Sequence, residues 1–242
     1  MVAAGASSSI EDLSWPAKAR VLVLAPHPDD FDAISITLRY LRDLGNEIRL
    51  TVVSPSWSGV EDSFCSPSDR AQKAFLREQE QLSSCALFGI QTGYVVFLRL
   101  SEDPNGDPVE DDANFLRLSA HLHEIRPQLV FCPHGHDPNP GHARTFRMLM
   151  RHIDAAGSPM LVLLNRDPKT VSMTAHIFKY FGDEEADWKG KLLRCHASQQ
   201  QRNLHVRGYG LDERILGVNR QIASEFPGAG PYAEVFEAVL AT

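Results

Sequence analysis

The chain reads V-L-V-L-A-P-H-P-D-D from Val21 to Asp30, and this stretch decides how the rest is organised. Its first part is a continuous apolar run, which is typical of a strand covered on both faces of a parallel sheet. Directly after that run come a histidine and two adjacent aspartates. Neighbouring carboxylates beside a buried strand are unfavourable unless a positive charge neutralises them. The stretch therefore predicts a buried strand with a charged site at its carboxyl end.

Strand-like and helix-like segments alternate along the chain after this stretch. Apolar, β-branched runs predict strands, and apolar residues at helical spacing followed by glycine predict helices. The alternation is typical of an α/β domain with a mainly parallel sheet and helices on both faces, as in Rossmann-like folds. Strands are predicted over residues 21–26, 47–54, 94–100, 128–134 and 159–166. Helices are predicted over about residues 31–45, 70–88, 113–126 and 142–153.

The regular alternation of strand-like and helix-like segments ends after residue 167. Residues 170–180 predict an added strand, and residues 189–208 predict one helix. The sequence contains no internal repeat, low-complexity tract or clear interdomain linker. We therefore expect an N-terminal extension over residues 1–20 and a single Rossmann-like domain over residues 21–242.

The composition is that of an ordinary globular protein. Of the 242 residues, 43% are hydrophobic and 23% are charged, and the net charge is −7. This acidic balance argues against a nucleic-acid-binding protein, which normally carries a basic stripe. We expect no transmembrane segment and no signal peptide, because no long apolar stretch follows a basic start. The four cysteines form no C-x-x-C pair, so we expect reduced thiols and a cytoplasmic location.

Two polar clusters follow predicted strands. One is H-P-D-D at residues 27–30, and the other is H-G-H-D-P-N-P-G-H at residues 134–142. In open parallel sheets ligands bind beyond the carboxyl ends of the strands, so the two clusters can meet in space. Histidine and carboxylate ligands with an open position suit a catalytic Zn²⁺, which lowers the pKa of its water to roughly 7. The clusters therefore predict a divalent metal site.

Each cluster also has a simpler explanation. One aspartate after the first strand can cap a helix, and His142 can be an exposed helical residue. A capping aspartate, however, explains neither the neighbouring histidine nor the second cluster. The chain has no G-x-G-x-x-G after the first strand and no G-x-S-x-G, so neither a dinucleotide site nor a serine hydrolase is supported. We favour the metal site.

The A-P-H-P-D-D segment, with the Asn-Pro-Gly-His stretch at residues 139–142, resembles the family of PIG-L/LmbE-like N-acetylglucosaminyl deacetylases. Two further segments are similar to that family: Arg-Glu-Gln-Glu at residues 77–80 and His-Ala-Ser-Gln at residues 196–199. The resemblance therefore spans residues 21 to about 200. Taken alone, Arg77 and Glu80 are expected to form an ion pair between adjacent helical turns.

The resemblance implies a set of roles for the matching residues. His27, Asp30 and His142 would bind the metal, and Asp29 would be the general base that activates water. The implied reaction is hydrolysis of the N-acetyl group of an amino sugar or related small molecule, with Zn²⁺ polarising the carbonyl. A site of two histidines and one aspartate also accepts Fe²⁺ or other divalent ions.

Asn139 stands where members of that family often have a histidine that acts as an acid. An amide cannot deliver a proton, although it can donate a hydrogen bond to an oxyanion. His136 or His134 could supply the acid, or these histidines could bond only to backbone. Trp57 could stack on a sugar ring or be buried in its loop, and His196 could contact the site or only pack. The predicted catalytic residues are Asp29, His136 and Asn139, and the predicted substrate-binding residues are Trp57, His134 and His196.

The sequence supports one leading function and two alternatives. The leading function is a zinc-dependent N-deacetylase acting on a small N-acetylated sugar or glycoconjugate. One alternative is an amidase for another small acylated amine. The other is a metal- or ligand-binding homologue with weak or no deacetylase activity, which Asn139 favours. The sequence leaves open whether the protein is a homo-oligomer.

Overall fold

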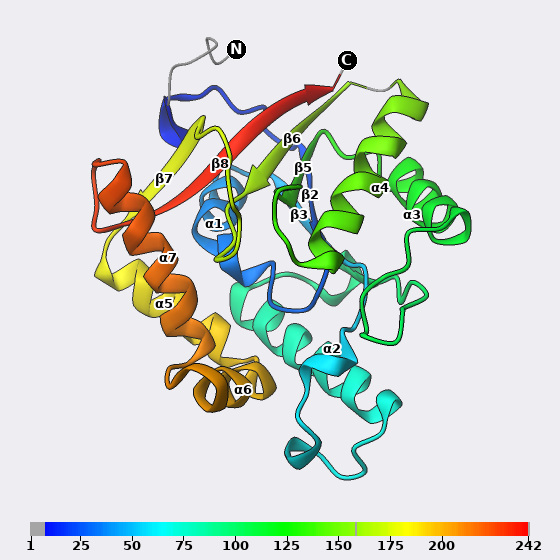
Figure 1. Ribbon diagram of the computed structural model, residues 1–242. Helices are drawn as coiled ribbons and strands as arrows, with labels where there is room; N and C mark the ends of the chain where they lie inside the picture. Colours follow the sequence, from blue (N-terminus) through cyan, green and yellow to red (C-terminus); the bar gives the residue numbers. More distant parts are fainter. Residues whose placement is uncertain (1–7, 158, 242) are drawn as a thin grey trace.

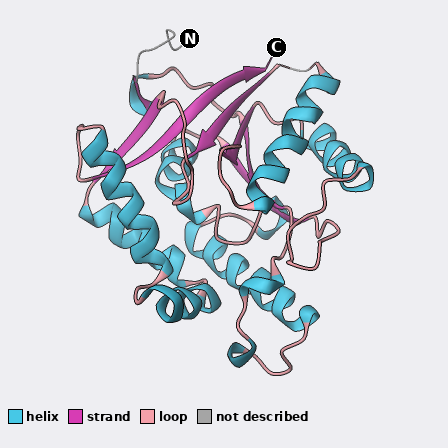
Figure 2. Cartoon of the chain, in the orientation of Figure 1, coloured by secondary structure: helices cyan, strands magenta, loops and turns pink. Residues whose placement is uncertain are grey.

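The computed structural model describes residues 8–157 and 159–241, and its described strands form one eight-stranded sheet (Figures 1 and 2). The strand order is β1-β7-β8-β6-β5-β2-β3-β4. All neighbouring strands are parallel except β8, which runs antiparallel to both β6 and β7. The predicted α/β fold with a mainly parallel sheet is therefore confirmed. The strands are β1 (Ser8–Ser9), β2 (Arg20–Ala25), β3 (Glu47–Val52), β4 (Val95–Phe97), β5 (Leu129–Pro133), β6 (Met160–Asn165), β7 (Ile177–Phe181) and β8 (Tyr232–Ala241).

Helices cover both faces of the sheet. Strand β2 shows the reason, because it has apolar side chains on both faces. Alternate residues of a strand point to opposite faces. Val21 and Val23 belong to one buried cluster, whereas Leu22 and Leu24 belong to another. The first cluster includes side chains of α1, α2 and α5, and the second includes side chains of α3 and α4. The helices are α1 (Ser35–Asp43), α2 (Arg70–Phe88), α3 (Asp112–Ile125), α4 (Pro140–Ala156), α5 (Asp183–Arg194), α6 (Ala197–Arg207) and α7 (Leu211–Glu225).

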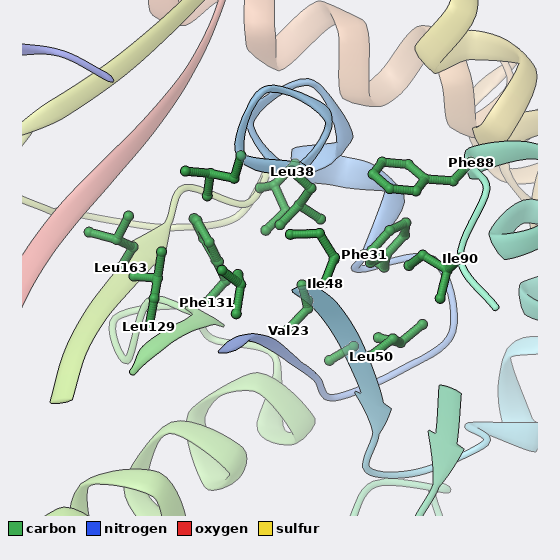
Figure 3. Close-up of a cluster of buried hydrophobic side chains, with 14 of the residues drawn as sticks. Val23, Phe31, Leu38, Ile48, Leu50, Phe88, Ile90, Leu129, Phe131 and Leu163 are labelled. Carbon is green, nitrogen blue, oxygen red and sulfur yellow. The ribbon is translucent and has the colours of Figure 1, made fainter. Parts of the chain in front are cut away.

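The first cluster fixes the segment that follows β2. Figure 3 shows Val23, Phe31 and Leu38 packed together beneath α1 and against Phe88 of α2. The rings of Phe31 and Phe88 meet edge to face, with centroids 5.0 Å apart. Because Phe31 is fully buried, the residues just before it are held at the carboxyl end of the sheet.

The region after residue 167 differs most from the sequence-based prediction. The prediction of a single helix over residues 189–208 was wrong. The structure has two helices in this region, α5 and α6, separated by Cys195 and His196. The predicted strand over residues 170–180 is confirmed only from Ile177. Strand β1, helix α7 and the antiparallel strand β8 were not predicted. Within the described residues, no helix combines the length and apolar character needed to cross a membrane.

Strands β6, β5 and β2 are neighbours in the sheet, so the segments that follow them meet at one edge. The segment after β2 carries residues 27–30, and the segment after β5 leads into α4. The segment after β6 carries Asp167. Helices α6 and α7 lie together beside this edge (Figure 1).

Candidate metal centre and active site

Three side chains from two neighbouring loops form a compact group. His27 and Asp30 follow β2, and His142 lies in the first turn of α4 after β5. His142 Nε2 lies 3.3 Å from Asp30 Oδ1, and His27 Nδ1 lies 3.6 Å from Asp30 Oδ2. One potential ligand atom of each residue lies within 4.8 Å of the others. The sequence-predicted ligand set is thus brought together in space.

The contacts of this group fit a divalent cation. Nε2 of His27 is buried without a hydrogen-bond partner among the described residues, an arrangement that is costly for a polar atom. Two imidazoles and one carboxylate are a typical donor set for zinc with an open position. A Cβ built on Gly141 would overlap His27 Nε2, so only glycine lets α4 approach this imidazole. The residues present therefore fit a metal ion.

Carboxylates surround His142 on its other side. Its Nδ1 lies 3.1 Å from Asp137 Oδ2 and 3.9 Å from Asp167 Oδ2. A histidine ligand commonly bonds a carboxylate through its second nitrogen, which fixes the ring orientation. Burial opposes the charged form of His142, but Asp30, Asp137 and Asp167 hold its pKa well above its ordinary value. Burial raises the pKa of Asp167 to about 7, although the charge of His142 opposes this rise.

Asp29 has an unusual backbone conformation that is held from two sides. Its φ is 97°, a left-handed value that is uncommon for a residue other than glycine. Its backbone N–H donates to Gln81 Oε1 at 2.9 Å, and Arg77 Nη2 donates to its Oδ2 at 3.2 Å. Arg77 also donates to the carbonyl of Pro28. These contacts from α2 place the Asp29 side chain in the cavity wall beside the ligand group.

Burial raises the pKa of Asp29, although the neighbouring charge of Arg77 lowers it and that of Asp30 raises it further. The adjacent Asp30 behaves differently. Burial favours its neutral form, but His142 and His27 hold its pKa below its ordinary value. The pKa values of the two adjacent carboxylates are therefore shifted in opposite directions by their surroundings.

A cavity of about 400 Å³ opens next to these groups. It is lined by His27, Asp29, Asp30, Asn139 and His142, which come from the two predicted clusters. Asn139 Oδ1 accepts from the backbone N–H of Gly141 at 3.0 Å, so its amide nitrogen is the atom left to donate. The cavity is large enough for a small ligand such as a sugar.

Four of the predicted site residues do not line this cavity, although the structure describes all of them: Trp57, His134, His136 and His196. His136 is exposed, and Ser172 Oγ lies 3.0 Å from its Nδ1. His134 is buried, with its Nε2 3.3 Å from Glu237 Oε2. The catalytic role of His136 and the substrate-binding role of His134 remain predictions without support from this geometry.

Trp57 and His196 lie in other contacts. The guanidinium carbon of Arg70 lies 5.4 Å from the centroid of the Trp57 ring. His196 is fully buried, and its Nε2 lies 2.6 Å from Asp32 Oδ2. The charge and hydrogen bond of Asp32 raise the pKa of His196, although burial opposes its charged form. His196 therefore contacts the segment after β2 through Asp32 rather than through the cavity.

The two supporting sequence motifs contact each other, but not as expected. Arg77 and Glu80 were predicted to pair with each other, and this was wrong. Arg77 pairs with Asp29, whereas Glu80 accepts from the backbone and the hydroxyl of Ser198, both at 2.7 Å. The buried positions of these side chains explain the difference, because each reaches a partner inside the fold rather than its neighbour on the helix.

Asp107 and Asp167 belong to the site but were not predicted. Asp107 Oδ1 lies 3.7 Å from His27 Nε2, and both aspartates line the cavity. Asp167 comes just after β6, so the rule that ligands lie beyond strand ends could have found it. Asp107 lies in a long loop whose position the sequence does not predict.

The chain matches the family model described as PIG-L: GlcNAc-PI de-N-acetylase over residues 22–153, whereas a search of curated proteins gave no match. Among solved structures, the N,N'-diacetylchitobiose deacetylase from Pyrococcus horikoshii is similar, with 18% identity, a TM-score of 0.75, and coverage of 91% of this chain and 84% of that chain.

Other similar structures include a second deacetylase and a hydratase. The zinc-inhibited form of teicoplanin deacetylase Orf2 has 15% identity, a TM-score of 0.68, and coverage of 91% of this chain and 98% of that chain. The 4-carboxy-2-hydroxymuconate hydratase GalB from Pseudomonas putida has 17% identity, a TM-score of 0.68, and coverage of 92% and 96%. At these identities the similarity shows a shared fold, whereas the family match covers more than half of the sequence. The chain therefore belongs to the PIG-L family.

Proposed function

We propose that this protein is a metal-dependent N-deacetylase that hydrolyses the acetamide of an amino sugar or glycoconjugate. The observation that carries the proposal is the buried group of His27, Asp30 and His142 with Asp29 beside it in the same cavity wall. Family membership and the deacetylases among the similar folds support it. We further propose zinc as the ion, N-acetylglucosamine derivatives as substrates and the cytoplasm as the location.

In this proposal the three ligand residues hold the ion, which supplies a Lewis acid for the acetamide carbonyl and lowers the pKa of water. Asp29 would take a proton from that water at its carboxylate and pass it to the leaving amine. Arg77 and Gln81 hold Asp29 in place for this task. Asn139 can donate a hydrogen bond from its amide nitrogen to the developing oxyanion.

The test is to measure bound metal and acetate release for the wild type and for Asp29→Asn. We expect the variant to keep its metal and to lose about 10²–10⁴-fold in kcat, because general-base catalysis contributes on that order. Asp112→Asn, an exposed carboxylate at the start of α3, is the control and should keep both properties. Full turnover by Asp29→Asn would contradict the proposed role of this residue.

A second candidate is a metal- or ligand-binding homologue with weak hydrolytic activity, or an amidase for another small acylated amine. It is favoured by Asn139, because an amide supplies no proton to a leaving group. The hydratase of similar fold also illustrates that one fold hosts several chemistries. Stoichiometric metal without acetate release from any member of a broad N-acyl panel would favour this candidate over the first.

A further inference from the structure

One buried carboxylate in the segment after β2 has no part in the proposed mechanism. Asp32 is fully buried, and three side chains contact its two oxygens. Ser84 of α2 donates its hydroxyl to Oδ1. Gln81 of α2 donates from Nε2 to Oδ2 at 3.3 Å, and His196 Nε2 lies 2.6 Å from the same oxygen. All three partners are fully buried as well, so these contacts replace the hydration that the carboxylate has lost.

Helix capping does not explain this carboxylate. Asp32 begins a short 3₁₀ helix, residues 32–34, that leads into α1. Within the described part of the chain, its side chain contacts other side chains and accepts from no backbone N–H. The N–H groups of Ile36 and Thr37, in the first turn of α1, donate instead to Glu234 at 3.1 and 2.8 Å.

The side-chain amide of Gln81 links Asp32 to Asp29. Its Oε1 accepts from the backbone N–H of Asp29 at 2.9 Å, while its Nε2 donates to Asp32. A carboxylate only accepts, and a backbone N–H only donates. Asp32 therefore requires the nitrogen of the amide on its own side, and this leaves the oxygen for Asp29. An amide rotated by half a turn would place a donor against the N–H of Asp29.

Asp29 depends on this contact because its backbone is left-handed. At a φ of 97° a residue with a side chain is strained, and such a conformation persists only where its surroundings hold it. Arg77 holds the carboxylate of Asp29, whereas Gln81 holds its N–H. Loss of the N–H contact would release the backbone and move the carboxylate from its place in the cavity wall.

We infer that Asp32 is a positioning residue that acts through the amide of Gln81 to hold the backbone of Asp29. The inference rests on the proposed function, because it takes Asp29 as the general base. Ser84 and His196 hold the Asp32 carboxylate in turn. Asp32 does not line the cavity, so its effect reaches the reaction only through these contacts.

The first experiment compares Asp32→Ala with Asp32→Asn in zinc-loaded protein, with N-acetylglucosamine as the substrate. Alanine removes the acceptor, and we expect kcat to fall about 10–100-fold with KM within about twofold, the size of effect caused by displacing a catalytic group by about 1 Å. Asparagine keeps an oxygen for Gln81 and can donate to Ser84, so its kcat should stay within about threefold of the wild type. Both variants should keep their zinc. Wild-type kcat or loss of zinc in Asp32→Ala overturns the inference, and so do equal losses in the two variants.

A double-mutant cycle tests whether Asp32 acts through Gln81. Gln81→Met removes both polar ends of the amide at similar length, and we expect kcat to fall about 10–100-fold. Asp32→Ala/Gln81→Met should lose no more than about threefold beyond the larger single loss, because both changes interrupt the same series of contacts. Losses that multiply indicate independent structural damage and overturn the inference.

Asn46→Asp is the matched control. Asn46 is a buried amide just before β3, at the opposite end of the sheet from the cavity. Its Oδ1 accepts from the backbone N–H of Ala19 at 3.0 Å, as that of Gln81 does from Asp29, and its Nδ2 donates to the carbonyl of Leu41 at 2.9 Å. The variant should lower the thermal midpoint without changing kcat or bound zinc. A loss of kcat equal to that of Asp32→Ala would show general destabilisation and overturn the inference.

Hydrogen exchange of the Asp29 amide, followed by NMR in zinc-loaded protein, needs no turnover. We expect this amide to exchange about 10²-fold or more slowly in the wild type than an unprotected amide, and about tenfold or more faster in Asp32→Ala and Gln81→Met than in the wild type. Asp32→Asn and Asn46→Asp should keep the protection. This pattern supports the positioning role even if the wild type releases no acetate, whereas an unprotected Asp29 amide in the wild type overturns it.

One further result separates the inference from the proposed function. Acetate release that is lost in Asp29→Asn but kept in Asp32→Ala, with the Asp29 amide equally protected in wild type and Asp32→Ala, overturns the positioning role. It leaves the deacetylase proposal standing.

Discussion

Residues 22–153 and the residues that follow them build the site in different ways. The first region is a regular series of parallel strands and helices that contributes the ligand group and Asp29. The second contributes the antiparallel strand β8 and helices α5 to α7, which cover the first region and line the cavity with basic side chains. The family match covers the first region alone. The comparison teaches that both regions line one cavity, although only the first follows the regular strand–helix alternation.

Asp30→Ala tests the first region most severely. Asp30 is the carboxylate between two imidazoles, so we expect the variant to lose bound metal and its kcat to fall about 10³-fold or more. Elemental analysis of the purified protein and an acetate-release assay measure both effects. Removal of metal from the wild type by a chelator should cause the same loss of activity, and added Zn²⁺ should restore it. Normal metal content in the variant would remove Asp30 from the ligand set.

Lys189→Met tests how the second region supports the first. Lys189 is fully buried, with its Nζ 2.7 Å from Glu234 Oε1, and Glu234 also accepts from the backbone N–H groups of Ile36 and Thr37. Breaking a buried pair leaves a charge uncompensated, so we expect about 3–5 kcal/mol of lost stability by denaturant unfolding.

The double variant Lys189→Met/Glu234→Gln refines this test. It removes both charges while keeping an acceptor for the first turn of α1, so it should recover part of the stability. Lys191→Met, at an exposed position of the same helix, is the matched control and should change stability by less than about 0.5 kcal/mol. No recovery in the double variant would argue against an electrostatic origin.

Gly141→Ala tests the close approach of α4 to the ligand group. The added Cβ would overlap His27 Nε2 and displace the imidazole, so we expect metal affinity to fall about 10–100-fold. A competitive titration with a chelating dye measures this loss. Gly217→Ala is the control: apart from its chain neighbours and the backbone of its own helix, no described atom lies within 4 Å of the added Cβ, and alanine should stabilise α7 by roughly 0.5–1 kcal/mol. Unchanged metal affinity in Gly141→Ala would place the ion away from His27.

His196→Gln gives the smallest expected effect and tests the contact between the two regions by pH. The pKa of His196 is raised in the folded protein by Asp32, so its stabilising contribution is present below about pH 6.5 and is lost as pH rises through the folded pKa. The stability advantage of the wild type over the variant should therefore shrink from slightly acidic to alkaline pH. His123→Gln, at an exposed position of α3, should show no such trend relative to wild type.

The parts predicted correctly from the sequence are those governed by local patterns. The apolar run of β2 and the glycine after α2 predicted elements that the structure contains, with α2 bounded at Arg70 and Phe88 as expected. The rule on strand ends predicted that the two polar clusters could meet, and they do because β2 and β5 are neighbours. The choice of His27, Asp30 and His142 within these clusters came from the family resemblance. These features depend on periodicity and topology, which a sequence carries directly.

The parts that were missed depend on contacts between distant residues. The break between α5 and α6 coincides with His196, whose partner Asp32 lies 164 positions earlier. His134 follows a strand as predicted, but it lies against Glu237 of β8, a strand that was not predicted. Asp107 reaches His27 from a loop without a periodic pattern. None of these pairings leaves a local signal in the sequence.

The position of β8 has a consequence for how the chain folds. Residues 232–241 pair on one side with β6 and on the other with β7, and they carry Glu234 to the first turn of α1. Until β8 has formed, no strand pairs with both β6 and β7, and the backbone N–H groups at the start of α1 lack the Glu234 carboxylate that accepts their hydrogen bonds. Contacts of such high sequence separation slow folding and leave strand edges open meanwhile. The first turn of α1 is therefore expected to become fully ordered only after residues 232–241 have been synthesised and have paired with β6 and β7.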